Sequence, residues 1–289
     1  MSLYLLDLWT LWAIFAVCAT IVGALMKFSG FLHVGAAAFV GVGAYTAALM
    51  STRYGADPQL ALLATVPIGI AFGIGFHLLV ARLSGDTLAL ATLAIGIVLH
   101  GIMLNAVSIT SGPMGIAAIP QWPPFFGHSA VDATVFLALV LAMLAFAQKT
   151  MFGLRTCALR EDEGLAAELE LQPQRLRLVV WIMSSTILTV AGGLLAFQLR
   201  FIDPSSFTVR ESVSILAMAL LFPSLRGFGG SIGALIFIAA PELLRFIGLP
   251  ADLGAELRQL LFGAALLIVV SRTPWGGVQK TSAAGGTDA

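Results

Sequence analysis

Charged residues are scarce in this 289-residue chain: Lys, Arg, Asp and Glu make up 10% of it, against about 25% in soluble domains. Hydrophobic residues make up 59%, and the mean hydropathy is +0.98. This scarcity excludes an ordinary water-soluble domain. Fifteen basic and fifteen acidic residues cancel, which leaves no footprint for nucleic acid. The composition predicts an all-α integral membrane protein, because backbone polar groups in lipid must be bonded within helices.

Cysteine and the common catalytic motifs are also lacking. The only two cysteines, Cys18 and Cys157, have no metal-ligand spacing, so we expect no disulfide and no metal site. The chain has no GxxxxGK[ST] phosphate loop and no HExxH metal motif. We therefore expect no catalytic residue, no cofactor and no enzyme. A membrane enzyme using His33 or His100 is an alternative, but the sequence supplies no evident partner carboxylate.

Nine apolar runs are bounded by charge, proline or glycine clusters. A membrane-crossing helix needs about 20 apolar residues, and these runs are predicted to be such helices. Glycines within them are expected to let neighbouring helices approach closely. The predicted spans are 8–26, 35–50, 60–81, 87–107, 131–148, 178–199, 211–225, 231–247 and 256–271, and the packing glycines are Gly41, Gly43, Gly69, Gly73 and Gly75.

The distribution of Lys and Arg between the loops predicts the orientation. With the N-terminus outside and the C-terminus inside, ten basic residues lie in the cytoplasm and five outside. Residues 1–276 then form a single transmembrane domain with a cytoplasmic loop at 149–177. The Gly- and Ala-rich tail, 277–289, is expected to be disordered in the cytoplasm.

The 149–177 loop concentrates the charge of the chain. Nine of the thirty charged residues lie between Arg155 and Arg177. Good helix formers, early acids and apolar Leu165 and Leu169 at i, i+4 predict a short amphipathic helix over 159–169. Such a helix either docks on a soluble partner or is a solvated connector that fixes topology.

Polar groups within and beside the spans suggest a route for a solute. The outward segment from Thr110 to Ile116 is rich in Gly and Pro, which break a helix and expose backbone groups. It is either part of a pathway or an ordinary turn, and polar residues inside spans are as readily interhelical hydrogen bonds. The candidate pathway residues are Asn105, Ser111, Gly112, Pro113, Met114, Gly115, Ser184, Ser185, Thr189 and Gln198.

Ionisable residues are expected only at or near the ends of spans, as for Glu211 and Glu242. An ion-coupled carrier usually needs such a group inside the membrane. This pattern therefore argues against the main alternative, a self-sufficient secondary carrier or channel. It favours a passage that is opened by a conformational change driven from elsewhere.

Several segments, in order, resemble the permease subunits of bacterial ABC importers for branched-chain amino acids, of the LivM type. They include Gly85-Asp86-Thr87-Leu88-Ala89-Leu90-Ala91-Thr92-Leu93, Ser111-Gly112-Pro113-Met114-Gly115-Ile116, Phe152-Gly153-Leu154-Arg155, Gly227-Phe228-Gly229 and Pro274-Trp275-Gly276. The resemblance runs from about Lys27 to Trp275, nearly the whole membrane part.

The resemblance implies a translocation subunit in the bacterial inner membrane, powered by ATP bound to a partner subunit. It further implies a second related permease and an external substrate-binding protein. The cytoplasmic loop is similar to the segment that couples to the ATPase, which favours docking over the connector. The implied coupling residues are Arg155, Arg160, Glu161, Asp162, Glu163, Ala166 and Ala167.

This chain departs from the family at several positions. Ser111, Glu170, Thr189 and Arg226 stand where the family usually has Gly, and Met114 where it commonly has Asn or Asp. Ser111 and Met114 lie on the outward segment, so the substrate stays open among branched-chain amino acids, urea, short amides and aromatic acids.

Overall fold

The computed structural model describes residues 2–83, 85–125, 127–161, 172–222, 228–246 and 263, and within them the chain is helical, with one isolated β-bridge. The α-helices are α1 (Ser2–Ala24), α2 (Ala36–Thr52), α3 (Pro58–Val80), α4 (Gly85–Asn105), α5 (Val107–Thr110), α6 (Ser129–Lys149), α7 (Met151–Glu161), α9 (Pro173–Leu199), α10 (Val209–Leu220) and α11 (Gly229–Phe246). A π-helix, η1 (Leu25–Ser29), extends α1, and two short 3-10 turns are η2 (Gly112–Met114) and η3 (Pro204–Phe207).

Eight of the nine predicted spans correspond to helices in the described residues, with boundaries that differ by a few residues. The ninth, 256–271, lies outside the described residues except for Gly263, as does the tail 277–289. Five helices are long and apolar enough to cross a membrane, whereas α2 and the apolar part of α11 are shorter. The fold is therefore that of a multi-pass helical membrane protein, and its count of nine spans stays a prediction. The five are Leu3–Ser29, Pro58–Val80, Gly85–Asn105, Ser129–Lys149 and Pro173–Leu199.

Close helix packing in the centre depends on small residues. A Cβ atom at Gly43 on α2 would overlap the carbonyl oxygen of Thr189 on α9, and one at Gly192 would overlap that of Val40. Gly69 and Gly73 make equally close contacts between α3 and α9. Because lipid supplies no hydrophobic drive between helices, such close contact is what holds them together.

The predicted role of the glycines is confirmed at four of the five positions. Gly41 also packs tightly, against Met103 and Phe207, but a Cβ at Gly75 would meet nothing within 4 Å. The prediction for Gly75 is wrong because this residue lies on an exposed face of α3.

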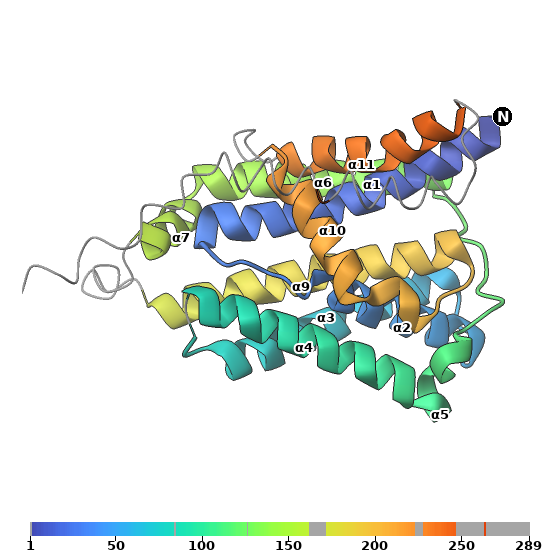
Figure 1. Ribbon diagram of the computed structural model, residues 1–289, viewed down its shortest axis with the longest axis horizontal. Helices are drawn as coiled ribbons and strands as arrows, with labels where there is room; N and C mark the ends of the chain where they lie inside the picture. Colours follow the sequence, from blue (N-terminus) through green and yellow to red (C-terminus); the bar gives the residue numbers. More distant parts are fainter. Residues whose placement is uncertain are drawn as a thin grey trace, which may run out of the picture.

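The two ends of the bundle differ in charge. Arg160 Nη1 donates to Lys27 O at 2.7 Å, and Arg177 Nη1 donates to Ala81 O at 3.4 Å, so α7, η1, and the loops at 81 and 172 share one end (Figure 1). At the opposite end, Arg53 Nη1 donates to Ser108 O at 2.7 Å. Arg160 and Arg177 thus lie at the end opposite to Arg53, whereas the division of the other basic residues and the orientation of the bundle stay predictions.

α10 starts against the first turn of α2. It is only 12 residues long, and it crosses obliquely toward α11 (Figure 1). Near its start, the buried Ser212 accepts a hydrogen bond through Oγ from the N–H of Ala37 at 3.0 Å. Arg210, in the same first turn of α10, is exposed.

Candidate functional site

The coupling segment is described as far as Glu161. The described part forms α7, from Met151 to Glu161, which overlaps the helix predicted over 159–169 only at its first three residues. Asp162, Glu163, Ala166 and Ala167 lie outside the described residues, and the side chain of Glu161 is not described. Arg155 is exposed to solvent.

Two contacts tie α7 to the membrane helices. Leu159 packs with Leu176 at the start of α9, and both are buried. Arg160 donates to Lys27 O, and its aliphatic stem lies against Gly30, which has φ +69° at the end of η1. A displacement of α7 therefore acts directly on α9 and on the linker between α1 and α2.

The segment 111–115, which the sequence predicts to face outward, forms a tight turn directly after α5. Ser111, Gly112 and Gly115 all have positive φ, and Met114 is 85% exposed. The turn is fixed to the loop after α9 by two backbone hydrogen bonds between Ile116 and Ile202, of 2.8 and 3.1 Å. Asn105 Nδ2 donates to Gly101 O in its own helix at 2.8 Å.

The strained residue in this turn is Ser111, with φ +62° and ψ +9°. A left-handed conformation costs a non-glycine residue roughly 1–2 kcal/mol, which explains why glycine suits this position. We expect Ser111→Gly to raise the free energy of unfolding by about 1 kcal/mol, since no side-chain hydrogen bond of Ser111 is recorded in the described residues. Thermal unfolding in detergent would test this, and a lower melting temperature would contradict it.

Three candidate pathway residues lie in helix contacts. Ser185 Oγ donates to Gly69 O at 2.7 Å and Thr189 Oγ1 to Thr65 O at 3.2 Å, both across the α3–α9 interface. Ser184 Oγ donates to Trp181 O within α9 at 3.1 Å. All three are buried, and the bonds of Ser185 and Thr189 correspond to the interhelical alternative that the sequence left open. Gln198 Nε2, by contrast, donates to Asp7 Oδ1 at 3.0 Å near the outer end of α1.

The histidines of the enzyme alternative have no catalytic partner among the described residues. His33 is 1% exposed and is surrounded by the rings of Phe39, Phe76 and Trp181, at centroid distances of 4.9, 6.0 and 5.5 Å. Within the described ranges, no group of three His, Cys, Asp or Glu is placed to hold a metal ion.

The structure reveals a cavity that the sequence did not predict. It has a volume of about 460 Å³ and lies between α1, α9, η3, α10 and α11. α1 and α9 contribute apolar residues to its lining, η3 and α10 contribute polar ones, and α11 contributes both kinds. Ordinary ligand sites have volumes of roughly 300–1,000 Å³. The residues that line it are Leu8, Leu11, Phe15, Leu195, Leu199, Ser205, Ser206, Arg210, Glu211, Phe237, Ile238 and Glu242.

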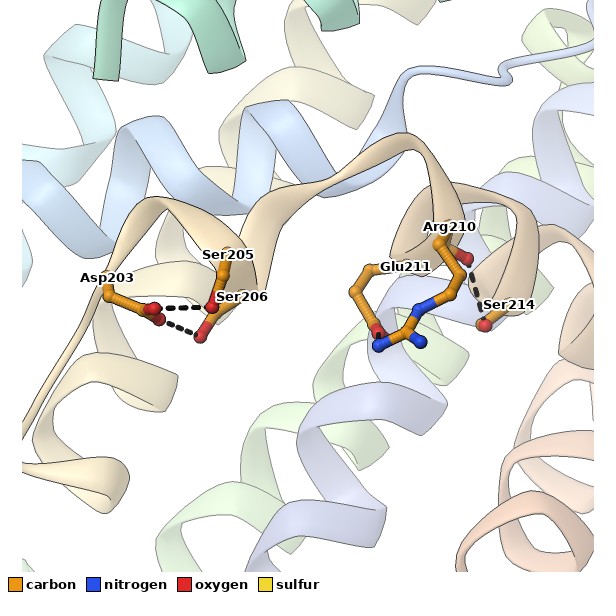
Figure 2. Close-up of polar contacts among 6 residues, drawn as sticks. All are labelled: Asp203, Ser205, Ser206, Arg210, Glu211 and Ser214. Carbon is orange, nitrogen blue, oxygen red and sulfur yellow. Dashed lines mark hydrogen bonds and ion pairs between the residues drawn. The ribbon is translucent and has the colours of Figure 1, made fainter. Parts of the chain in front are cut away.

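The polar wall carries charges of both signs. Arg210 Nη2 lies 3.7 Å from Glu211 Oε1, and their side chains are 68% and 24% exposed (Figure 2). Glu211 lies in the first turn of α10, which begins at Val209, and the cavity extends to Phe15 of α1. The expectation that ionisable residues lie only at or near the ends of spans stays a prediction. In the sequence, the only signal for this site was the segment 204–211, in which a turn is followed by a short span.

Asp203 holds the η3 turn beside this cavity. Its carboxylate accepts hydrogen bonds from the hydroxyls of Ser205 and Ser206, the second at 2.6 Å (Figure 2). Burial alone raises the pKa of Asp203, but hydrogen bonds from Ser205 and Ser206 together hold its pKa below the usual value. The turn is therefore stabilised above the unfolded-state pKa of about 3.9.

This stabilisation is lost as the pH falls through the lowered pKa of folded Asp203. We expect Asp203→Asn to cost about 1 kcal/mol at pH 7 and progressively less below about pH 4. Melting temperatures of the purified protein at several pH values would show the two curves converging in acid. Asp57→Asn, at an exposed aspartate that caps no helix with its side chain, is the control and should change little. A constant difference at every pH would contradict the assignment.

The bundle of apolar helices with a polar cavity within it defines a multi-pass membrane protein of the transporter class. The model of the family described as "Branched-chain amino acid transport system / permease component" matches residues 3–270. The chain belongs to this family, whose members are permease components and not enzymes.

Curated relatives agree with this assignment. The chain is 29% identical to the high-affinity branched-chain amino acid transport system permease protein LivM of Escherichia coli K12 and 30% identical to that of Salmonella typhimurium. Each match covers 93% of this chain and 69% of the relative. A probable branched-chain amino acid permease, LivH, of Methanocaldococcus jannaschii is 26% identical over 79% of this chain and 75% of its own length. No solved structure matches the chain significantly.

Proposed function

We propose that this chain is a translocation subunit of a bacterial ABC importer in the inner membrane, with branched-chain amino acids as its substrates. The main support for this proposal is the family match over residues 3–270, together with two LivM relatives that align with 93% of the chain. Relatives named as autoinducer 2 import permeases, LsrC of Salmonella, match only 66% of it. That difference supports an amino acid over other small polar solutes.

In this proposal, ATP is bound and hydrolysed by separate cytoplasmic subunits that grip the segment following α7. A second, related permease completes the pathway, and an external binding protein delivers the substrate to the end that carries the 108–130 loop. Two hydrogen bonds hold that loop against the start of α6: Trp122 Nε1 and the N–H of Phe125 both donate to Asp132 Oδ2, at 2.7 and 2.8 Å. A fixed outer surface suits docking of a partner, because it loses little entropy on binding.

The mechanism needs a mechanical path from α7 to the membrane helices. Closure of the ATPase subunits would displace α7 as a rigid lever. Leu159 would carry this motion to α9, and Arg160 would carry it to the η1–Gly30 linker. The glycine contacts between α2 and α9 would make these helices move as one unit. Alternating exposure of the cavity then requires no catalytic group in this chain.

The proposal is tested by purifying the tagged chain from mild detergent and identifying co-purifying proteins by mass spectrometry. An ATPase and a second permease in comparable amounts are expected, and the reconstituted assembly should take up leucine only with ATP. A chain that purifies alone and transports leucine down an ion gradient would instead establish the secondary carrier. We retain this alternative because the cavity beside α1 contains charged residues, which an ion-coupled carrier usually needs.

A further inference from the structure

The cavity between α1, α9, η3, α10 and α11 combines three chemical features at one place. Arg210 supplies a planar cation, Glu211 supplies an anion, and Leu11 and Phe15 of α1 supply an apolar wall. All of these groups come from this chain. A purely apolar solute would interact with neither charged side chain, and a simple ion would interact favourably with only one of them.

The two charges are held near one another but are weakly paired. The closest approach, 3.7 Å, is at the long end of an ion pair, and exposed pairs of this kind contribute little. The guanidinium of Arg210 has five N–H donors in a fork that matches a carboxylate, so one distant Glu211 oxygen does not occupy it. A ligand with its own carboxylate and ammonium would satisfy both side chains better than they satisfy each other.

The position of α10 adds to this complementarity. A short helix that begins inside a membrane protein has N–H groups without partners and a positive dipole end at its start. Broken helices of this kind face anionic groups of substrates in several transporter classes. Here Arg210 lies in the first turn of α10, so both features favour an anion at the same point.

We propose that this cavity is a recognition site for an α-amino acid with an apolar side chain. Arg210 binds the carboxylate, Glu211 binds the ammonium group, and Leu11 and Phe15 contact the side chain. Ser206, whose hydroxyl is held by Asp203, fixes the rim of the site. This assignment rests on the proposed function, because it names the groups with which the importer contacts its substrate.

Photo-leucine, the diazirine analogue of leucine, reports directly on the occupant. The complete importer in proteoliposomes is irradiated with this probe, and the adducts are mapped by mass spectrometry. Adducts are expected on the α1 segment from Leu8 to Phe15 or on Phe237 and Ile238 of α11. An excess of L-leucine should remove them, whereas leucinol, without a carboxylate, and 4-methylpentanoate, without an ammonium group, should not.

Two substitutions test the roles of the charges. In Arg210→Met and Glu211→Gln, the efficiency of ATP-driven leucine uptake should fall roughly 10- to 100-fold, since each loses a charge-assisted hydrogen bond. Photolabelling should fall with it, while the ATPase activity of the assembly persists. Arg200→Met and Asp57→Asn remove exposed charges outside the cavity and should leave uptake and labelling unchanged.

The outcomes separate this inference from the proposed function. Normal leucine uptake by both cavity variants, with wild-type adducts elsewhere, overturns the site and leaves the importer standing. An assembly that hydrolyses ATP but never transports leucine overturns the substrate and, with it, this assignment. Recovery of bound phosphatidylethanolamine that both variants release, with leucine labelling elsewhere, assigns the cavity to a lipid headgroup and overturns the inference as well.

Discussion

Replacing Glu161, Asp162 and Glu163 together with alanine is expected to abolish leucine uptake while the protein still inserts into the membrane. Glu161 ends α7 and the other two acids follow it in the sequence, next to Leu159 and Arg160, which contact α9 and the linker after α1. If the ATPase subunits grip this segment by complementary charge and shape, the variant loses the grip but keeps the membrane bundle. ATP hydrolysis by the assembly should continue or rise, because it no longer performs work on the permease.

Uptake and ATP hydrolysis are measured on the same proteoliposomes, since only their ratio reports coupling. Asp86→Ala is the control: Asp86 is an exposed acid in the first turn of α4, at the same end of the bundle as α7. Its loss should leave both rates unchanged. Normal uptake by the triple variant would show that the ATPase docks elsewhere and that the charged segment is only a connector.

The membrane helices could be predicted from the sequence because each is a long apolar run ended by charge or glycine. Lipid imposes helical hydrogen bonding on any such run, so composition and length suffice. The coupling helix was harder to place. The predicted helix over 159–169 overlaps the described residues only at 159–161, where α7 ends, so it stays a prediction, and α7 itself, which starts at Met151 after a single-residue break at Thr150, was not predicted.

The polar cavity could not be predicted for a different reason. Arg210 and Glu211 adjoin an apolar run, a position that normally corresponds to the membrane surface. The cavity forms where α10 lies near α1, α9 and α11, and the hydrogen bond of Ser212 to the first turn of α2 is one of the contacts that hold α10 in place. Contacts between segments 175 residues apart in the chain leave no local pattern. The roles of Ser185 and Thr189 were undecided for the same reason, since a hydroxyl in a span gives no sign of what it faces.

Gly192→Leu is expected to prevent stable folding, with a loss above about 4 kcal/mol, which is the range of severe core overpacking. A Cβ at this position overlaps the carbonyl oxygen of Val40 and approaches Ala44 N to 3.0 Å, so backbone must move against backbone. Gly43 faces Thr189 one turn away in the same way, and α2 cannot shift to relieve one contact without tightening the other. Dispersion between closely packed backbones is the main attraction in lipid, so separating α2 from α9 removes the force that joins them.

Gly75→Ala is the matched control for this prediction. Gly75 also lies within an apolar helix, but a Cβ there meets nothing within 4 Å. Alanine should stabilise α3 by roughly 0.5–1 kcal/mol, because it restricts the unfolded chain and has the higher helix propensity. Size-exclusion profiles of the fluorescently tagged variants in mild detergent would compare them, with thermal unfolding of those that remain monodisperse. A monodisperse Gly192→Leu protein with a wild-type melting temperature would contradict the close α2–α9 contact, and with it the rigid unit on which the proposed lever acts.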